Sequence, residues 1–217
     1  MTNRSFEFKC KDNRYIMRIP GEGTGKMINR RNEYEVYKQL EGKNITDPVI
    51  YISPENGYKI TKYIDGAKTC SCEEKNDVKR CMEYLRGFHD LKLQVKHSFN
   101  LFDQIEYYEK LRGSEPSIYR DYTSTKQQDL RTQEICRRPQ PKPQIALSTH
   151  IDAVCDNFLM TDEKIYLIDW EYAGMQDVHV DIAMFAIYAM FDKGDRLMNF
   201  CVFCILHGEV FEFFSSK

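Results

Sequence analysis

The segment HIDAVCDN at residues 150–157 and the segment IDWEY at residues 168–172 hold the densest set of chemically reactive side chains in this sequence. Apolar stretches at 145–147 and 164–168 flank the first segment, and they predict two short strands. Phosphoryl transfer from ATP needs a carboxylate that orients the attacking hydroxyl and accepts its proton, and oxygen ligands for a Mg²⁺ ion that bridges the phosphates. One loop and one strand end can supply all of these groups.

Three residues have the positions that this chemistry requires. Asp152 has the position of the base, Asn157 lies at the end of the loop, and Asp169 emerges from the following strand. A hairpin between the two segments would return Asp169 to Asn157. His150 is expected to hold the loop, because a carboxylate serves as the base and no second histidine is nearby. The alternative is that these residues form turns and caps, which Asp and Asn favour.

The first third of the chain predicts a small antiparallel sheet that carries one helix. Alternating apolar residues indicate strands at 5–9 and 14–19, and the segment PGEGTG ends the second one. Residues 27–40 place apolar side chains near one helical face, with charged residues on the other sides. Turn-forming residues between 49–52 and 58–64 predict a hairpin.

After residue 66 the pattern becomes helical, with apolar residues at helical spacing over 78–88 and 102–111. We therefore expect an α+β fold in two parts. An N-terminal lobe over 1–66 holds the nucleotide-binding sheet and its helix, and a mainly helical C-terminal lobe over 67–217 contains the catalytic loop.

Three later segments complete the predicted architecture. Residues 121–142 are polar, weakly periodic and interrupted by prolines, which predicts an irregular excursion or a poorly formed helix. The apolar runs at 182–191 and 197–206 are about half of the ~20 residues that a membrane-spanning helix needs. We expect both runs to be core helices.

The charge balance argues against polyanionic partners. The 217 residues include 31 Lys and Arg against 33 Asp and Glu, a net charge of −2 without a long block of one sign. Such a chain has no electrostatic footprint for nucleic acid or an anionic membrane. The polar N-terminus lacks the apolar core of a signal peptide, so we expect a cytoplasmic protein without membrane insertion. No pattern indicates an oligomeric state.

Eight cysteines raise the question of disulfides or metal binding. Disulfide scaffolds belong to short secreted chains, so reduced thiols are expected. The pairs Cys70/Cys72 and Cys201/Cys204 lack a second His or Cys pair at zinc spacing. Buried or incidental cysteines are therefore favoured over a metal or redox role.

Several blocks of the sequence resemble the choline/ethanolamine kinases, and within them the bacterial choline kinases of the aminoglycoside-phosphotransferase-like superfamily. The blocks are YIMRIPGEGTGKMINRRNEYEVYKQL (15–40), NGYKITKYIDGA (56–67), HIDAVCDNF (150–158), IDWEYAGMQD (168–177) and VDIAMFAIYA (180–189). The resemblance covers most of 1–115 and 145–192. It implies a protein-kinase-like two-lobed fold, ATP and Mg²⁺, and transfer of the γ-phosphoryl group to the hydroxyl of choline, which gives phosphocholine.

The resemblance also implies roles for individual residues. Asp152 resembles the catalytic base, and Asn157 and Asp169 resemble the Mg²⁺ ligands. Arg18, on the third strand, takes the place where related kinases have a lysine on the α- and β-phosphates. An arginine suits that place, because its fork of donors fits phosphate and carboxylate. The alternative for Arg18 is an exposed strand residue.

Glu33, on the following helix, is the expected ion-pair partner of that arginine, with Glu35 as a competitor. Tyr63 and Ile64 match the hinge that holds the adenine edge. The phosphate-covering loop is represented only by Thr2, Asn3 and Ser5, because the strand and Gly-Gly turn that relatives have before it are absent from this sequence.

A quaternary ammonium must be bound by aromatic faces and nearby carboxylates, because it has no hydrogen-bond donor. Tyr172 matches an aromatic wall of the family, and Trp170 and Glu171 lie beside it in the sequence. For Trp170, core packing is the alternative. Asp181 resembles an acidic residue that braces the catalytic loop, and Asp177 is a second candidate for that task.

The chain is shorter than the family pattern, which continues with helices that bring tryptophans to the choline pocket. We therefore expect an incomplete C-terminal lobe and an incomplete aromatic cage. Two alternatives to an active choline kinase stay open: a kinase for ethanolamine or an aminoglycoside, and a non-catalytic remnant. An aminoglycoside would need several carboxylates, whereas choline needs aromatic walls.

Overall fold

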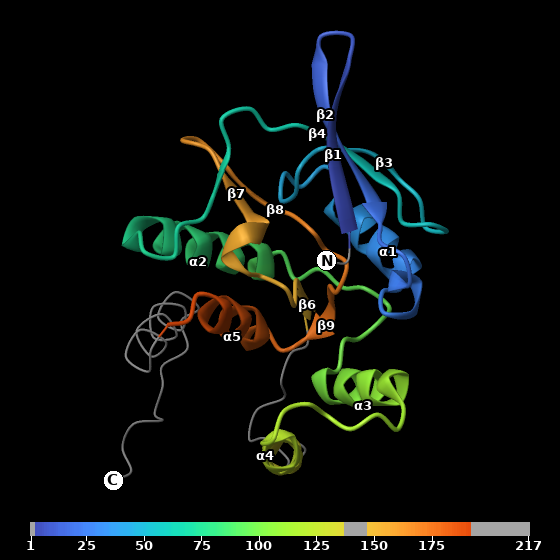
Figure 1. The fold of residues 1–217 in the computed structure, drawn as a ribbon. Coiled ribbons are helices and arrows are strands. Elements are labelled where there is room, and N and C mark those ends of the chain that lie inside the picture. The colour runs from blue at the N-terminus through green and yellow to red at the C-terminus, as the bar shows by residue number, and fades with distance from the viewer. Residues whose placement is uncertain (1–2, 137–146, 192–217) are drawn as a thin grey trace. The chain divides into compact units, whose positions relative to one another are not determined.

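The structure, a computed structural model, describes residues 3–136 and 147–191. The chain forms two compact units, one of residues 1–98 with 146–217 and one of residues 99–145. Antiparallel strands and helices confirm the predicted α+β class (Figure 1). The lobe boundary at residue 66 stays a prediction.

The described elements of the first unit are β1 (Asn3–Cys10), β2 (Asn13–Pro20), η1 (Thr24–Lys26), α1 (Arg30–Leu40), β3 (Val49–Ile52), β4 (Lys59–Lys62), β5 (Lys68–Thr69), α2 (Lys75–Asp90), β6 (Leu147–Thr149), η2 (Cys155–Asn157), β7 (Phe158–Met160), β8 (Ile165–Leu167), β9 (Gly174–Gln176) and α5 (His179–Tyr188). The second unit contains α3 (Leu101–Arg112) and α4 (Tyr122–Cys136).

The N-terminal sheet has four antiparallel strands in the order β1-β2-β4-β3. β1 and β2 form a long hairpin, visible in blue in Figure 1, in which Ser5 pairs with Arg18. The pairing of β3 with β4 confirms the hairpin predicted over 49–64. Arg18 therefore lies on the second strand of this chain, and its placement on a third strand was wrong, because no strand precedes β1 in the described residues.

Helix α1 begins at Arg30, three residues later than predicted. The cause is Asn29, whose extended backbone and side chain cap the helix: its Oδ1 accepts hydrogen bonds from the backbone N–H groups of Arg31 and Asn32. Met27, predicted on the apolar face, is instead 42% exposed. The rest of the face is as predicted, with Leu40 buried at the helix end.

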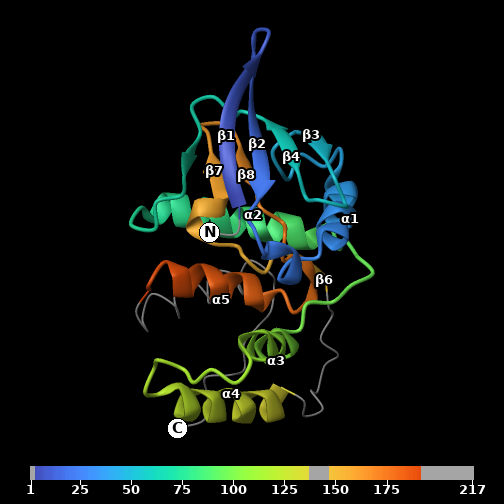
Figure 2. The ribbon, with the colours of Figure 1, turned by 45° about the vertical axis from the view of Figure 1, so that its right-hand side comes forward.

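The hydrophobic core of the first unit lies around α2. Figures 1 and 2 show α2 between the β7–β8 hairpin and α5, and aromatic contacts join these layers. Phe88 of α2 packs edge-on against Trp170, and Phe158 of β7 packs edge-on against Phe185 of α5. Each of these buried side chains stabilises the fold by about 1.5–3 kcal/mol.

Two short ladders surround the chemically dense segments. β7 and β8 form the hairpin predicted between them, with β5 on the other side of β7. Of the strand predicted at 145–147, residues 145 and 146 lie outside the described residues, and Leu147 begins β6, which pairs with β9. The hairpin places the end of β8 beside η2.

Residues 182–188 of the apolar run at 182–191 lie in α5, as predicted, but only one face of this helix joins the core: Ile182 and Phe185 are buried, whereas Ile187 and Tyr188 are exposed. The run at 197–206 lies outside the described residues. Among the residues that the structure describes, no helix is long and apolar enough to cross a membrane.

The second unit contains two helices joined through one carboxylate. Glu109 of α3 accepts hydrogen bonds from the Tyr122 hydroxyl and, at 2.7 Å, from Lys126 Nζ, both on α4. The segment 121–142 was predicted to be irregular or a poorly formed helix. Residues 137–142 lie outside the described residues, and the structure shows a helix over Tyr122–Cys136. Its anchors are polar, which explains why its apolar periodicity is weak.

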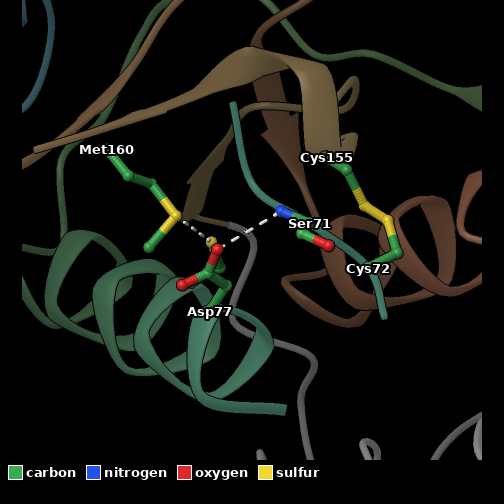
Figure 3. The surroundings of a disulfide bond; sticks show 6 residues. Ser71, Cys72, Asp77, Cys155 and Met160 are labelled. Carbon is green, nitrogen blue, oxygen red and sulfur yellow. Dashed lines mark hydrogen bonds between the residues drawn. A yellow bond between two sulfur atoms is a disulfide. The ribbon is translucent and has the colours of Figure 1, made fainter. Parts of the chain in front are cut away.

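One disulfide joins Cys72, after β5, to Cys155 of η2 (Figure 3). The expectation of reduced thiols was wrong for this pair, because the fold brings residues 83 positions apart to a Cα–Cα distance of 6.6 Å, which a disulfide can span. Cys70, Cys81 and Cys10 are free thiols. The pair Cys201/Cys204 lies outside the described residues.

Candidate active site

The loop at 150–157 brings Asp152 and Asn157 together. The Nδ2 group of Asn157 donates to the backbone carbonyl of Asp152 at 2.8 Å and to its Oδ2 at 3.2 Å. The turn is closed by the backbone N–H of Asn157, which donates to the carbonyl of Val154 at 2.9 Å. The orientation of the Asp152 carboxylate is therefore set by the residue at the other end of the loop.

Asp181 and His150 hold this loop in place through hydrogen bonds to the backbone. The Asp181 carboxylate accepts hydrogen bonds from the backbone N–H groups of His150 at 3.0 Å and Ile151 at 2.7 Å, and lies 2.9 Å from His89 Nε2. His150 is fully buried, and its Nε2 lies 2.8 Å from the Ile168 carbonyl. These contacts agree with the structural tasks predicted for Asp181 and His150.

Asp169 is held beside the loop by backbone contacts. The N–H of Ile168 donates to the Asn157 carbonyl at 2.9 Å, so the predicted return of the hairpin is observed. Asp169 has a positive φ of 66°, a conformation that costs a non-glycine residue about 1–3 kcal/mol and recurs at functional sites. Its side chain is 31% exposed.

Burial raises the pKa of Asp152, against an opposing effect of His150, and the charge of Asp169 raises it further. A carboxyl whose pKa is raised by burial and by a second carboxylate nearby is typical of sites that bind a cation or handle a proton.

Arg18 joins the sheet to this loop. Its buried guanidinium Nη1 lies 2.5 Å from Glu33 Oε1 and 3.0 Å from Asp169 Oδ1, while Nη2 donates to the carbonyl of Gly57 at 3.1 Å. Burial lowers the pKa of Arg18, but the hydrogen bond and charge of Glu33 outweigh it and raise that pKa. The structure thus pairs Arg18 with Glu33, whereas Glu35 is exposed.

A second arginine, which sequence reasoning missed, extends the ion pairs. Arg30 Nη1 donates to Glu33 Oε2 at 2.9 Å and to Glu171 Oε2 at 3.0 Å. Asn3, predicted to cover phosphates, instead donates to Glu171 at 2.8 Å and accepts from Arg30 Nη2 at 3.1 Å. The i,i+3 spacing of Arg30 and Glu33 was the signal available in the sequence.

Burial, followed by the charge of Asp169, raises the pKa of Glu171, while Asn3 and the two arginines lower it. The Glu171 carboxylate is buried against Arg30 and Asn3. Glu171 therefore pairs with Arg30 and Asn3, whereas the sequence predicted that it binds the substrate ammonium.

Trp170 is fully buried, so it packs in the core, which was the alternative to substrate binding. Its Nε1 donates to the Leu167 carbonyl at 2.8 Å, and its ring packs edge-on against His150 and Phe88. A ring with no exposed surface cannot form a wall for a substrate. Tyr172 is half-buried, and its role as an aromatic wall stays a prediction.

The remaining predicted nucleotide contacts lie at the sheet. Ser5 is exposed on β1, opposite Arg18. The Tyr63 N–H donates to the Arg14 carbonyl at 3.0 Å, and the Ile64 carbonyl accepts from Ala67 at 3.4 Å. Adenine binding by Tyr63 and Ile64 stays a prediction.

The donor set fits a hard cation. Both Asn157 hydrogen bonds use Nδ2, which leaves Oδ1 as an acceptor, and Asp169 is partly exposed. Mg²⁺ prefers oxygen ligands and takes few from the protein, completing its shell with water and substrate phosphates. In keeping with so small a set, no group of three or more His, Cys, Asp or Glu in the described ranges could hold a metal by itself.

The family model for choline/ethanolamine kinase matches residues 1–200. The chain belongs to the choline/ethanolamine kinase family. A relative in this family, Protein LicA of Haemophilus influenzae, is 27% identical in an alignment 195 residues long that covers 84% of this chain and 69% of the relative. The chain spans 54% of a second LicA sequence from that species.

Solved structures of the family share the fold. Choline kinase LicA from Streptococcus pneumoniae has a TM-score of 0.81 and 25% identity, over 92% of this chain and 70% of that protein. LicA in complex with AMP has a TM-score of 0.81 and 26% identity, over 94% of this chain and 70% of that protein. These likenesses confirm the predicted protein-kinase-like fold and the assignment to a family of kinases.

Proposed function

We propose that the chain transfers the γ-phosphoryl group of ATP to the hydroxyl of choline, giving phosphocholine. The supporting observation is the convergence of the loop residues Asp152 and Asn157 with Asp169 and Arg18, through the hydrogen bonds between Asn157 and Asp152 and the ion pair between Arg18 and Asp169. The family description and the names of the LicA relatives support this choice of reaction.

Asp152 orients the acceptor hydroxyl and takes its proton on the carboxylate. The hydrogen bond from Asn157 Nδ2 holds Oδ2 in place, and the raised pKa of Asp152 brings it closer to the range in which a carboxylate is an effective base. His150 and Asp181 keep the backbone of this loop in position.

Arg18 binds the phosphates of ATP. Its Nε atom is buried and has no hydrogen-bond partner among the described residues, so a donor is present beside the ion pair with Glu33. Asn157 and Asp169 would hold Mg²⁺ through oxygen atoms, and the bound cation would neutralise negative charge on the phosphates. The nucleotide complex of a LicA relative supports ATP as the donor.

Tyr172 contacts the trimethylammonium group of choline. Ethanolamine is the second candidate acceptor, because the matching family model covers both substrates and neither Trp170 nor Glu171 offers a free face in the described site. A primary ammonium can donate hydrogen bonds, whereas the quaternary ammonium of choline cannot and depends on aromatic faces and nearby carboxylates.

An assay of ADP release with choline, ethanolamine and kanamycin tests these alternatives. We expect choline to stimulate release and Asp152→Asn to abolish it while the thermal melting curve stays within a few degrees of the wild type. Stimulation by ethanolamine or kanamycin alone would overturn the choice of choline. Stimulation by none of the three would overturn the proposed activity and favour a non-catalytic remnant.

A further inference from the structure

Two guanidinium groups and three carboxylates form one continuous network at the site: Arg18, Arg30, Glu33, Asp169 and Glu171. Their formal charges sum to −1. All of the side chains except that of Asp169 are almost completely buried. Each carboxylate therefore depends on the two arginines for its charge balance, because buried charges need close partners.

Arg30 contacts the two carboxylates that are furthest from solvent. Its Nη1 donates to both Glu33 and Glu171, and Nη2 donates to Asn3. Gly57 packs closely against the aliphatic part of the Arg30 side chain, since a Cβ atom on Gly57 would lie 2.5 Å from Arg30 Cδ. Gly57 also has a φ of 73°, which glycine adopts without strain.

Arg18 lies at the centre of the same network, and its Nη1 is shared among the carboxylates. Besides Glu33 and Asp169, Glu171 Oε2 lies 3.8 Å from its Nη1. For Arg18 to bind a phosphate through Nη1 as well as through the unpartnered Nε, it must exchange Asp169 for the nucleotide. The exchange is favourable only if the other carboxylates are neutralised by another cation.

We propose that Arg30 is a positioning residue that neutralises Glu33 and Glu171, so that Arg18 is released to bind the phosphates of the nucleotide. The proposal rests on the proposed function, since it takes ATP as the ligand of Arg18. Without Arg30, Glu171 has only Arg18 as a cationic partner in the described network, and Arg18 is then the only arginine that neutralises the three carboxylates.

A lysine can replace Arg30 only in part. One guanidinium bridges two carboxylates with Nη1 and reaches Asn3 with Nη2, a fork that an ammonium group lacks. Arg31, the next residue, is exposed on the same helix and provides a matched control.

The test measures ATP binding by isothermal titration calorimetry, once with MgCl₂ and once with EDTA. We expect Arg30→Gln to weaken ATP binding at least ten-fold in both conditions, and Arg31→Gln to change it less than two-fold. The double variant Arg30→Gln/Glu171→Gln should recover binding to within about three-fold of the wild type, because the unpaired carboxylate is then gone. Arg30→Lys should fall between the wild type and Arg30→Gln.

Three results would overturn the proposal. The first is unchanged ATP binding by Arg30→Gln. The second is a double variant that melts like the wild type and still binds ATP as weakly as Arg30→Gln. The third is a loss of ATP affinity in Arg30→Gln that occurs only with MgCl₂. If Arg30→Gln does not fold, ATP binding by Arg30→Lys and by the double variant is compared instead. Wild-type affinity of Arg30→Lys, or a folded double variant that binds ATP more weakly than Arg30→Lys, would then overturn the proposal. Wild-type protein that binds no ATP would contradict the proposed function itself.

Discussion

Asp181 Oδ1 accepts a hydrogen bond at 2.7 Å from the backbone N–H of Ile151, a residue with the positive φ of 71°. A β-branched residue reaches this conformation only where its surroundings compensate the strain. The second oxygen of the same carboxylate accepts the N–H of His150. The shape of the loop that carries Asp152 thus depends on one buried side chain of α5.

Asp181→Ala should lower both stability and turnover. Two buried N–H groups would lose their acceptor at about 1–3 kcal/mol each, so we expect the free energy of unfolding to fall by roughly 2–6 kcal/mol. Urea denaturation measures this loss, and ADP release measures the fall in kcat. Asp162→Ala, at an exposed position, should change the free energy of unfolding by less than about 0.5 kcal/mol.

Variants of Trp170 and Tyr172 should distinguish a residue that packs in the core from one that contacts the substrate. Trp170→Phe removes the hydrogen bond to Leu167 and some volume, and should cost about 1–3 kcal/mol of stability with an unchanged KM for choline. Tyr172→Ala should raise the KM for choline several-fold with a smaller loss of stability. The opposite pattern would place Trp170, and not Tyr172, at the substrate.

The chemistry-bearing residues could be predicted from the sequence because they lie in short segments with fixed spacing. Asp152, Asn157 and Asp169 are joined by one hairpin, and local pattern is sufficient to predict a hairpin. Arg18 and Glu33 were found through the resemblance to a family, which carries the long-range information that alternation and helical periodicity lack.

Other features needed the tertiary structure. Arg30, the first residue of a helix with a charged neighbour, has the pattern of an exposed position, and only its contact with Glu171, 141 residues away, reveals its burial. The direction of the Trp170 ring depends on Phe88, and the pairing of Cys72 with Cys155 depends on how β5 meets the loop. None of these contacts leaves a periodic trace in the sequence.

The disulfide should stabilise the first unit and respond to reductant. Closing a loop of 83 residues corresponds to about 4.5 kcal/mol in the chain-entropy description. We expect dithiothreitol to lower the melting temperature of the wild type to that of Cys72→Ser, and to leave Cys72→Ser unchanged. Cys10→Ser removes an exposed free thiol and should melt like the wild type in both conditions.

Asp177 should make the start of α5 sensitive to acid. Its Oδ1 accepts the N–H of His179 at 2.9 Å and lies 2.6 Å from the His179 ring, and this hydrogen bond lowers the pKa of Asp177. A carboxyl whose folded-state pKa is lowered stabilises the fold above its unfolded value of about 3.9, and the contribution is lost as the pH falls through the folded value.

The variant Asp177→Asn keeps the acceptor for the His179 N–H and removes only the charge. At pH 7 we expect it to be less stable than the wild type by roughly 1 kcal/mol, since a charge at the start of a helix contributes about that much. The difference should shrink as the pH falls below about 3.9, because the unfolded chain then takes up a proton on this carboxyl while the folded one, whose pKa is lowered, stays ionised to lower pH. Thermal melts of both proteins from pH 3 to 8 measure it. A difference that stays constant over this range would mean that the side chain contributes through shape alone.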